Sequence, residues 1–223
     1  QAEDGIRDSV ASRGLGDVYK RQHNNCSGKH SGFLTLNQYL GGGSEYLDYT
    51  HPVQKSVREA FESMTETSNL GFAIDGCSAP NFATTVHGLA RAMSKMASLS
   101  TNNLRDKAST KLVEAMVTHP DLVAGEGRAC TELMRAMEGK VAVKTGAEAV
   151  FIAIIPEKQI GIAVKIIDGG TRAAESAITA LLIKYGVLDI SSPIAKKWLS
   201  GPIKNWRGTV TGEMKLSNSF IKL

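Results

Sequence analysis

Two apolar segments joined by a very short connection constrain the fold of this chain most strongly. They cover residues 149–155 and 159–167, and only residues 156–158, Pro-Glu-Lys, lie between them. A parallel crossover needs a dozen or more residues, so the two segments are expected to pair as an antiparallel hairpin. Residues 151–155 are apolar without alternation, which predicts that both faces of this strand are buried. The sequence therefore predicts a sheet with helices on each face.

Further elements follow from the spacing of apolar residues along the chain. A third strand is expected at residues 140–144, and a short extended segment at residues 71–74. Helices are expected at residues 33–40, 53–64, 81–97, 105–117, 131–137 and 171–186. Aromatic residues make up only 6% of the chain and glycines number 22, which suits a compact α/β protein better than an aromatic-rich β-sandwich. The predicted fold class is α/β.

Composition excludes several classes of function. The net charge is +4, and Lys and Arg are scattered without a run of five, so no nucleic-acid surface is indicated. No apolar stretch approaches the about 18 residues of a membrane span, and no signal peptide is recognisable. The three cysteines, Cys26, Cys77 and Cys130, lack the spacing of a disulfide framework. Free thiols or metal ligands in a reducing, cytoplasmic compartment are therefore expected.

The first residues differ from the rest of the chain. Residues 1–22 show no sustained apolar period, and residues 12–22 resemble translated sequencing-adapter sequence. We expect residues 1–22 to be a non-native head, with the native chain continuing upstream of His23. Residues 23–223 would then form the C-terminal two-thirds of a longer domain.

Three short segments concentrate reactive side chains. Residues 23–30 hold a thiol, a hydroxyl, an amine and two imidazoles. Residues 75–81 repeat the Cys-Ser pair beside a carboxylate, and residues 144–148 place a Lys-Thr-Gly word after a short apolar run. Helices and strands do not need this density of reactive groups. We expect the three segments to converge on one site.

The thiols suggest a metal site. Zinc favours thiolate and imidazole in a four-coordinate shell. The spacing offers Cys26, Cys77 and either His30 or Lys29 as ligands, with Asp75 beside them. There is no Cys-x-x-Cys pair, so two buried structural cysteines are the alternative reading of the same residues.

Lys144 lies where a catalytic amine could act. It ends an apolar strand, so its stem can be buried while its amine reaches a cleft. A lysine acts as a base only after its pKa is lowered by burial or by a neighbouring positive charge. A surface lysine that ends an edge strand is the alternative. Cys130 has no polar neighbours of this kind and is expected to be inert.

Four sequence words taken together resemble those of a known family. They are His-Asn-Asn-Cys-Ser-Gly-Lys-His at 23–30, Asp-Gly-Cys-Ser-Ala-Pro-Asn at 75–81, Val-Ala-Gly-Glu-Gly-Arg at 123–128 and Lys-Thr-Gly-Ala-Glu at 144–148. In this order they resemble the rhizobial-type L-asparaginases, or asparaginase II family. The resemblance runs from residue 23 to about residue 215, and the first two words are highly specific to it.

The resemblance implies a fold and a reaction. The fold would be similar to serine β-lactamases and penicillin-binding proteins: a mainly antiparallel sheet flanked by helices, with a helical subdomain. The reaction would be the hydrolysis of L-asparagine to L-aspartate and ammonia by a Ser-Lys nucleophile system. L-Asparagine would be the small-molecule partner, with no nucleic acid and no membrane involved. The oligomeric state stays open, with a homodimer as one alternative.

The resemblance also implies roles for particular residues, with zinc as cofactor, and it favours Lys29 over His30 as the third ligand. Carried over by motif, the metal ligands are Cys26, Lys29 and Cys77, the substrate-binding residues are Asp75 and His30, and the catalytic residue is Lys144. A lysine can bind a metal only as the neutral amine, so the ion itself would have to depress the pKa of Lys29.

One departure from the family pattern concerns the nucleophile. The family's Ser-x-x-Lys segment precedes the His-Asn-Asn-Cys word, and residues 1–22 contain no such segment. No nucleophile is therefore assigned, and this chain by itself is expected to be inactive if the segment is missing. The alternatives are a penicillin-binding or β-lactamase-like serine hydrolase and a non-catalytic, zinc-stabilised domain.

Overall fold

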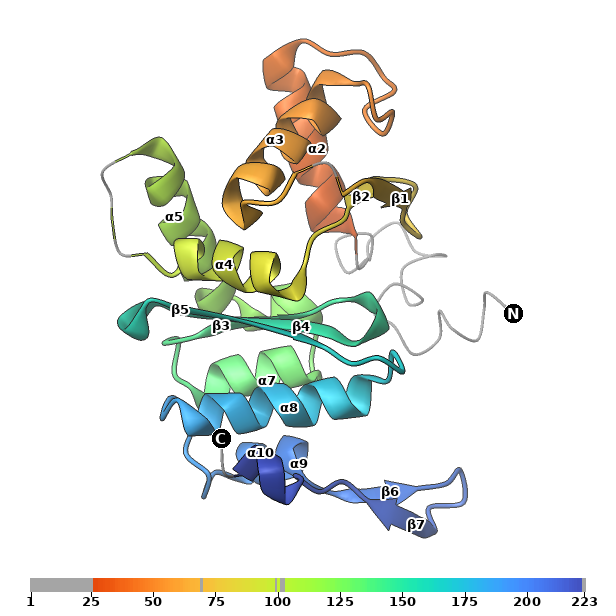
Figure 1. The fold of residues 1–223 in the computed structure, drawn as a ribbon, viewed down its shortest axis with the longest axis vertical. Helices are drawn as coiled ribbons and strands as arrows, with labels where there is room; N and C mark the ends of the chain where they lie inside the picture. The colour runs from red at the N-terminus through yellow and green to blue at the C-terminus, as the bar shows by residue number, and fades with distance from the viewer. Residues whose placement is uncertain (1–25, 69, 99, 101–102, 222–223) are drawn as a thin grey trace. The chain divides into compact units, whose positions relative to one another are not determined.

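The computed structural model of the chain describes residues 26–68, 70–98, 100 and 103–221 (Figure 1). The chain divides into two compact units, residues 1–92 and 93–223. The head predicted at residues 1–22 lies outside the described residues, and that prediction stays open. No helix in the described ranges is long and apolar enough to cross a membrane. The mixture of helices with small antiparallel sheets agrees with the predicted α/β class.

The first unit begins with two helices, α2 (Ser27–Leu40) and α3 (Pro52–Thr65). Gly41 ends α2 in the left-handed conformation, with φ 63°, which glycine adopts without a Cβ clash. Pro52 is the first residue of α3, where a missing backbone N–H breaks no helical hydrogen bond. Both helices were predicted from apolar spacing.

Helix α2 starts earlier than the sequence predicted. The helix was expected at residues 33–40, but α2 begins at Ser27 and Cys26 is its N-cap residue. The reactive segment therefore forms the first turn of a helix. Phe33 is buried and Leu36 packs beside it, whereas Tyr39 is 86% exposed, so only part of the apolar stripe of α2 contacts the core.

A short hairpin follows, made of β1 (Phe72–Ile74) and β2 (Pro80–Phe82). The predicted helix at 81–97 is wrong at its start, because β2 occupies residues 80–82 and helix α4 covers Val86–Met96. Thr85 marks the true start, since its hydroxyl accepts a hydrogen bond from a backbone N–H of the first turn. Pairing with β1, which apolar spacing does not show, overrides the helical pattern.

The second unit is built on a three-stranded antiparallel sheet of β3 (Ala142–Thr145), β4 (Val150–Ile155) and β5 (Ile160–Lys165), in that order. The turn between β4 and β5 is a single 3₁₀ turn, Pro156–Lys158. The helices of this unit include α5 (Leu104–Thr118), α6 (Pro120–Ala124), α7 (Ala129–Ala136), α8 (Thr171–Lys184) and α9 (Pro193–Leu199). The predicted antiparallel hairpin is confirmed.

Both faces of β4 are buried, as the unbroken apolar run predicted. Phe151, Ala153 and Ile155 belong to a core cluster with α7, α8 and α9, and Figure 1 shows α7 and α8 along this face of the sheet. Ile154 and Ile152 lie on the other face, in a smaller cluster with residues of α5 and with Met93, Met96 and Ala97 at the end of α4. Helices therefore cover the sheet on both sides.

The helix expected from residue 131 onward begins earlier, and Thr131 lies inside α7. Its side chain is buried, and its hydroxyl lies 2.6 Å from the carbonyl oxygen of Gly125 and 3.1 Å from that of Pro120. The hydroxyl therefore ties α7 to the segment around α6. The helix starts two residues earlier, at Ala129.

Candidate functional site

The turn between β1 and β2 is organised by one carboxylate. Asp75 Oδ1 accepts hydrogen bonds from the backbone N–H groups of Cys77, at 2.9 Å, and Ala79, at 3.1 Å. The backbone closes the turn as well, because Ser78 N–H donates to the carbonyl oxygen of Asp75 at 3.0 Å. Ser78 takes a left-handed conformation, with φ 68°. An Asp at the first position of such a turn is favoured by these side-chain-to-backbone bonds.

This turn presents Cys77 to the start of α2. The amine of Lys29 lies 2.5 Å from Asp75 Oδ2, and the two side chains are 35% and 25% exposed. The thiol of Cys77 is within hydrogen-bonding reach of Lys29, Asp75 and Cys26. The structure thus brings together Cys26, Lys29, Asp75 and Cys77, which we call the thiol–amine cluster. Lys29 and Asp75, which lie 46 positions apart in the chain, meet here.

Local charges decide the protonation of this cluster in the metal-free chain. Partial burial lowers the pKa of Lys29, but hydrogen bonds to Asp75 and Cys77 outweigh burial, so the pKa lies above its ordinary value. Burial raises the pKa of Asp75, but the hydrogen bonds from Lys29, Cys77 and Ala79 reverse this and hold it far below its usual range. Burial raises the pKa of the Cys77 thiol, and the charge of Lys29 offsets only part of that effect. The cluster therefore holds an ammonium, a carboxylate and a thiol.

Replacing Asp75 by asparagine tests these charges. In the metal-free protein at pH 7, Asp75→Asn is expected to lower the free energy of unfolding by about 1–2 kcal/mol, because charge-assisted hydrogen bonds are lost. Since the folded-state pKa of Asp75 is depressed, its contribution is complete above the unfolded value of about 3.9 and is lost as pH falls below it. The difference between wild type and variant should therefore shrink between pH 5 and pH 3 in urea titrations.

The control for this experiment is Asp121→Asn. Asp121 lies 4.0 Å from Arg135, and its side chain is 46% exposed, so its removal should cost little at any pH. A stability difference for Asp75→Asn that stays constant between pH 7 and pH 3 would contradict the described geometry.

His30 takes a different direction from Lys29. Its Nδ1 lies 2.9 Å from the hydroxyl of Tyr46, and its ring packs edge-on against Phe33 at 5.8 Å. Consecutive residues on a helix point about 100° apart, so Lys29 and His30 do not share one face. Lys29 therefore makes the hydrogen bond to Asp75 in the cluster. His30 instead packs against Phe33 in the small core of the first unit.

Lys144 belongs to the second unit. Side chains alternate along β3, so Lys144 shares a face with buried Ala142, opposite the face of Val143. Its amine donates a hydrogen bond to the carbonyl oxygen of Thr145, and the backbone N–H of Thr145 donates to Cys130 Sγ at 3.1 Å. Lys144 is thus half-buried at the end of an apolar strand, as predicted. Its convergence with the thiol–amine cluster stays a prediction, because the two lie in different units.

Cys130 is the buried neighbour of this strand end. Its side chain is fully buried in α7, and burial raises the pKa of its thiol despite the nearby charges of Lys144 and Arg128. A thiol held protonated in the core is a poor nucleophile and a poor metal ligand. The predicted inert role of Cys130 agrees with this environment.

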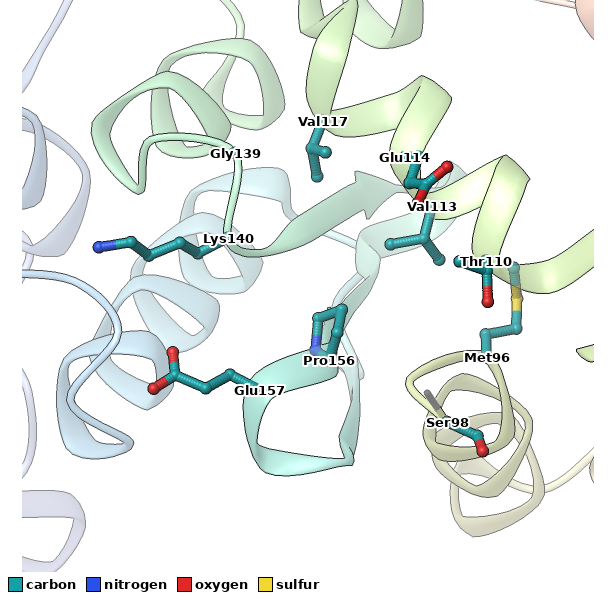
Figure 2. Close-up of a pocket in the computed structure, with 10 residues that line it drawn as sticks. All are labelled: Met96, Ser98, Thr110, Val113, Glu114, Val117, Gly139, Lys140, Pro156 and Glu157. Atoms are coloured by element: carbon teal, nitrogen blue, oxygen red, sulfur yellow. The ribbon is translucent and has the colours of Figure 1, made fainter. Parts of the chain in front are cut away.

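A hollow of about 280 Å³ lies elsewhere in the second unit, between α5 and the turn after β4. Figure 2 shows Val113 and Val117 pointing from α5 toward Pro156. None of the predicted site residues is among the described residues that line it. Its lining mixes apolar side chains with charged ones such as Glu114, Lys140 and Glu157, and none of the lining residues belongs to the four family words, so nothing assigns the substrate to this hollow.

The donor atoms of the thiol–amine cluster fit a zinc ion. Cys26 and Cys77 supply two sulfurs, the preferred zinc donors, and the amine of Lys29 lies beside them. Within the described ranges, no group of three or more His, Cys, Asp and Glu side chains is arranged to hold a metal ion. Among the described residues, the amine of Lys29 is the nitrogen donor that lies beside the two sulfurs.

A Ser-x-x-Lys spacing that the sequence analysis missed occurs once in the chain, at Ser219 and Lys222. Ser219 belongs to the short C-terminal helix α10 (Asn218–Ile221), and Lys222 lies outside the described residues. This spacing follows the Lys-Thr-Gly word, whereas the resemblance implies a Ser-x-x-Lys segment that precedes all four words. The spacing therefore gives no reason to assign a nucleophile.

Comparison with known families agrees with these motifs. A family model for L-asparaginase II matches residues 7–216. Because the match covers most of the chain, this protein belongs to the L-asparaginase II family. A comparison with curated proteins found no match. Family membership supports an asparaginase-type function, that is, an amidohydrolase that acts on a small molecule.

Proposed function

We propose that this protein is part of an L-asparaginase that hydrolyses the side-chain amide of L-asparagine to L-aspartate and ammonia. The observation that carries the proposal is the thiol–amine cluster. Two sequence words specific to the family, about 50 residues apart, place Cys26, Lys29, Asp75 and Cys77 side by side. A packing role for two cysteines would not require an ammonium and a carboxylate between them.

We infer that Cys26, Lys29 and Cys77 hold a zinc ion. Zinc would supply a fixed positive charge next to the substrate site when bound. Binding requires that Lys29 and Cys77 lose their protons and that Lys29 leaves Asp75, so zinc affinity should fall as pH is lowered. Asp75 Oδ2 would then lose its hydrogen bond from Lys29, while Oδ1 would still accept the backbone hydrogen bond that holds the turn.

Asp75 and His30 are proposed to bind the substrate. A carboxylate that keeps its charge at all working pH values can accept hydrogen bonds from the α-ammonium group of an amino acid. His30 is fixed by Tyr46 through one ring nitrogen, which leaves Nε2 as its second polar atom. The role assigned to the metal is substrate positioning rather than attack on the amide.

Lys144 is the proposed proton carrier. A serine hydroxyl of the family's Ser-x-x-Lys segment attacks the carboxamide carbon, and Lys144 as a neutral amine takes the hydroxyl proton. It then gives the proton to the departing nitrogen, which leaves as ammonia, and water hydrolyses the ester to L-aspartate. The half-buried position at the end of β3 supports this role, because the strand holds the stem of the side chain while the amine reaches the strand end, beside the carbonyl oxygen of Thr145.

We also infer a fold similar to serine β-lactamases and penicillin-binding proteins. The antiparallel order β3-β4-β5, with α8 packed against β4, supports it. The same likeness keeps a β-lactam-reactive hydrolase as the second candidate, since Lys-Thr-Gly suits both.

The proposal is tested by measuring ammonia release from L-asparagine by the zinc-loaded protein, as it stands and with a family Ser-x-x-Lys segment placed ahead of residue 23. Turnover of L-asparagine in the extended form is the expected result. Acylation by a β-lactam without ammonia release would favour the second candidate. Normal zinc content without turnover in either form would instead indicate a non-catalytic zinc-stabilised domain.

A further inference from the structure

The turn that joins β3 to β4 has an unusual backbone conformation. Glu148 and Ala149 both lie in the left-handed region, with φ values of 53° and 58°. Hairpin turns with two left-handed residues are normally built from Asn and Gly, because a larger side chain brings its Cβ too close to the backbone. Such conformations cost free energy and persist only where the surrounding structure holds them. Contacts around this turn must therefore stabilise it.

The turn is held from the end of β5. The register of the sheet places Lys165 opposite Val150, the residue that follows the turn. The Lys165 ammonium donates hydrogen bonds to the carbonyl oxygen of Glu148 and, at 3.0 Å, to that of Ile166. The backbone N–H of Ile166 donates in turn to the carbonyl oxygen of Ala149 at 3.2 Å. Two adjacent residues of the neighbouring strand and its end thus fix the carbonyl oxygens of both left-handed residues.

The same turn continues directly from the end of β3, where Lys144 lies. The backbone N–H of Gly146 donates to the carbonyl oxygen of Val150 at 2.7 Å, which closes the hairpin. The amine of Lys144 donates to the carbonyl oxygen of Thr145, the residue next to Gly146. A change in the turn would therefore redirect the carbonyl group that the Lys144 amine contacts.

We propose that Lys165 is a positioning residue for Lys144. Its ammonium holds the strained turn, and the turn fixes the strand end from which the Lys144 amine acts. The inference rests on the proposed role of Lys144 in asparagine hydrolysis, and it adds a residue that lies outside the four sequence words.

An ammonium group suits this place chemically. It has three donors, so it can serve two carbonyl oxygens at once, and a charged donor makes stronger hydrogen bonds than a neutral one. Lys165 is exposed, so the core does not depend on its side chain. Ordering a long, exposed side chain costs conformational entropy, and the bonds to the turn offset that cost.

The first test uses the chain as it stands and does not depend on turnover. Lys165→Met removes the ammonium and keeps a side chain of similar length. It should raise two rates by about 3-fold or more, because the turn then opens more often. One is hydrogen exchange at the Gly146 amide, followed by NMR, and the other is acetylation of Lys144 by acetic anhydride, followed by mass spectrometry.

Two further variants complete this test. Lys165→Arg should restore both rates to wild-type values, because a guanidinium also donates to two carbonyl groups. Lys158→Met is the matched control, since Lys158 is an exposed lysine in the turn at the opposite end of β4 and β5. Unchanged rates in Lys165→Met, or equal changes in Lys158→Met, would overturn the proposal whether or not the protein hydrolyses asparagine.

The second test measures kinetics in the form that carries a Ser-x-x-Lys segment. Lys165→Met should lower kcat by about 10-fold and leave KM within about two-fold of wild type, since a displaced amine moves protons more slowly but binds no substrate. Lys165→Arg should recover most of kcat. A change in KM alone, or no recovery by arginine, would contradict a positioning role. Absence of turnover in wild type would count against the proposed function instead, and the first test would still decide whether Lys165 holds Lys144.

Glu148→Asn tests whether strain in the turn is what Lys165 holds. Asn enters the left-handed region more readily than Glu, and Glu148 is exposed, so no packing is lost. The thermal midpoint should rise. Adding Lys165→Met to Glu148→Asn should change the acetylation rate of Lys144 by roughly half or less of its effect in wild type, because the two sites are coupled. A full-sized effect in this background would contradict the proposal.

Discussion

Replacing Lys144 by alanine is expected to lower kcat for L-asparagine hydrolysis by at least about 100-fold, in line with the loss of a positioned base. The measurement belongs in the form of the protein that carries its Ser-x-x-Lys segment. KM should change little, because the amine is proposed to move protons rather than to bind substrate, so kcat and kcat/KM should fall together. Coupled detection of ammonia gives both constants.

Lys140→Ala is the matched control for this variant. Lys140 precedes the same strand, and its side chain is 62% exposed. Among the described residues, it forms an ion pair with the exposed carboxylate of Glu138, at 3.7 Å. Its removal should leave both kinetic constants within about two-fold of wild type. Near-normal turnover of Lys144→Ala would remove Lys144 from the mechanism, and equal losses in both variants would point to damage of the strand instead.

The second large effect concerns the metal. Cys77→Ser is expected to weaken zinc binding by at least about 100-fold, because it removes one of two soft donors and second-shell losses alone cost 10- to 100-fold. Competition with a chromophoric chelator gives the affinity, and metal analysis after dialysis gives the stoichiometry. The serine hydroxyl keeps most of the volume of the thiol, so the turn held by Asp75 should persist.

Cys130→Ala is the control for the metal experiment. Cys130 is a thiol of the same chain, buried in the second unit and bonded by the N–H of Thr145. Its replacement should leave zinc stoichiometry unchanged in the folded protein, even where stability falls. Unchanged zinc content in Cys77→Ser would show that the ligand set is wrong.

The elements that the sequence predicted best are those with strong local signals. The connection of only three residues between two apolar runs predicted the hairpin of β4 and β5. The unbroken apolar pattern of β4 predicted that both of its faces are buried. Helix α8 followed from the stripe of Ala174, Ile178 and Leu182, all fully buried. Period and connection length are local properties, so they can be read without knowing the rest of the fold.

The elements predicted poorly depend on partners distant in the sequence. The short strand β2 looked helical because its pairing with β1 leaves no periodic pattern. Apolar spacing in α2 showed which residues share a face, but not that Tyr39 would face solvent. The meeting of Cys26 with Cys77 was expected from the motifs, whereas the bond between Lys29 and Asp75 was not, although an Asp two residues before Cys77 could have indicated the turn.

The most direct test of the central claim is X-ray absorption at the zinc edge of the zinc-loaded protein. If Cys26, Lys29 and Cys77 hold the metal, the spectrum should show two sulfur neighbours at about 2.3 Å and lighter neighbours at about 2.0–2.1 Å. Cys77→Ser should leave one sulfur. A wild-type spectrum with no sulfur neighbour, or with four, would contradict the thiol–amine cluster as the metal site.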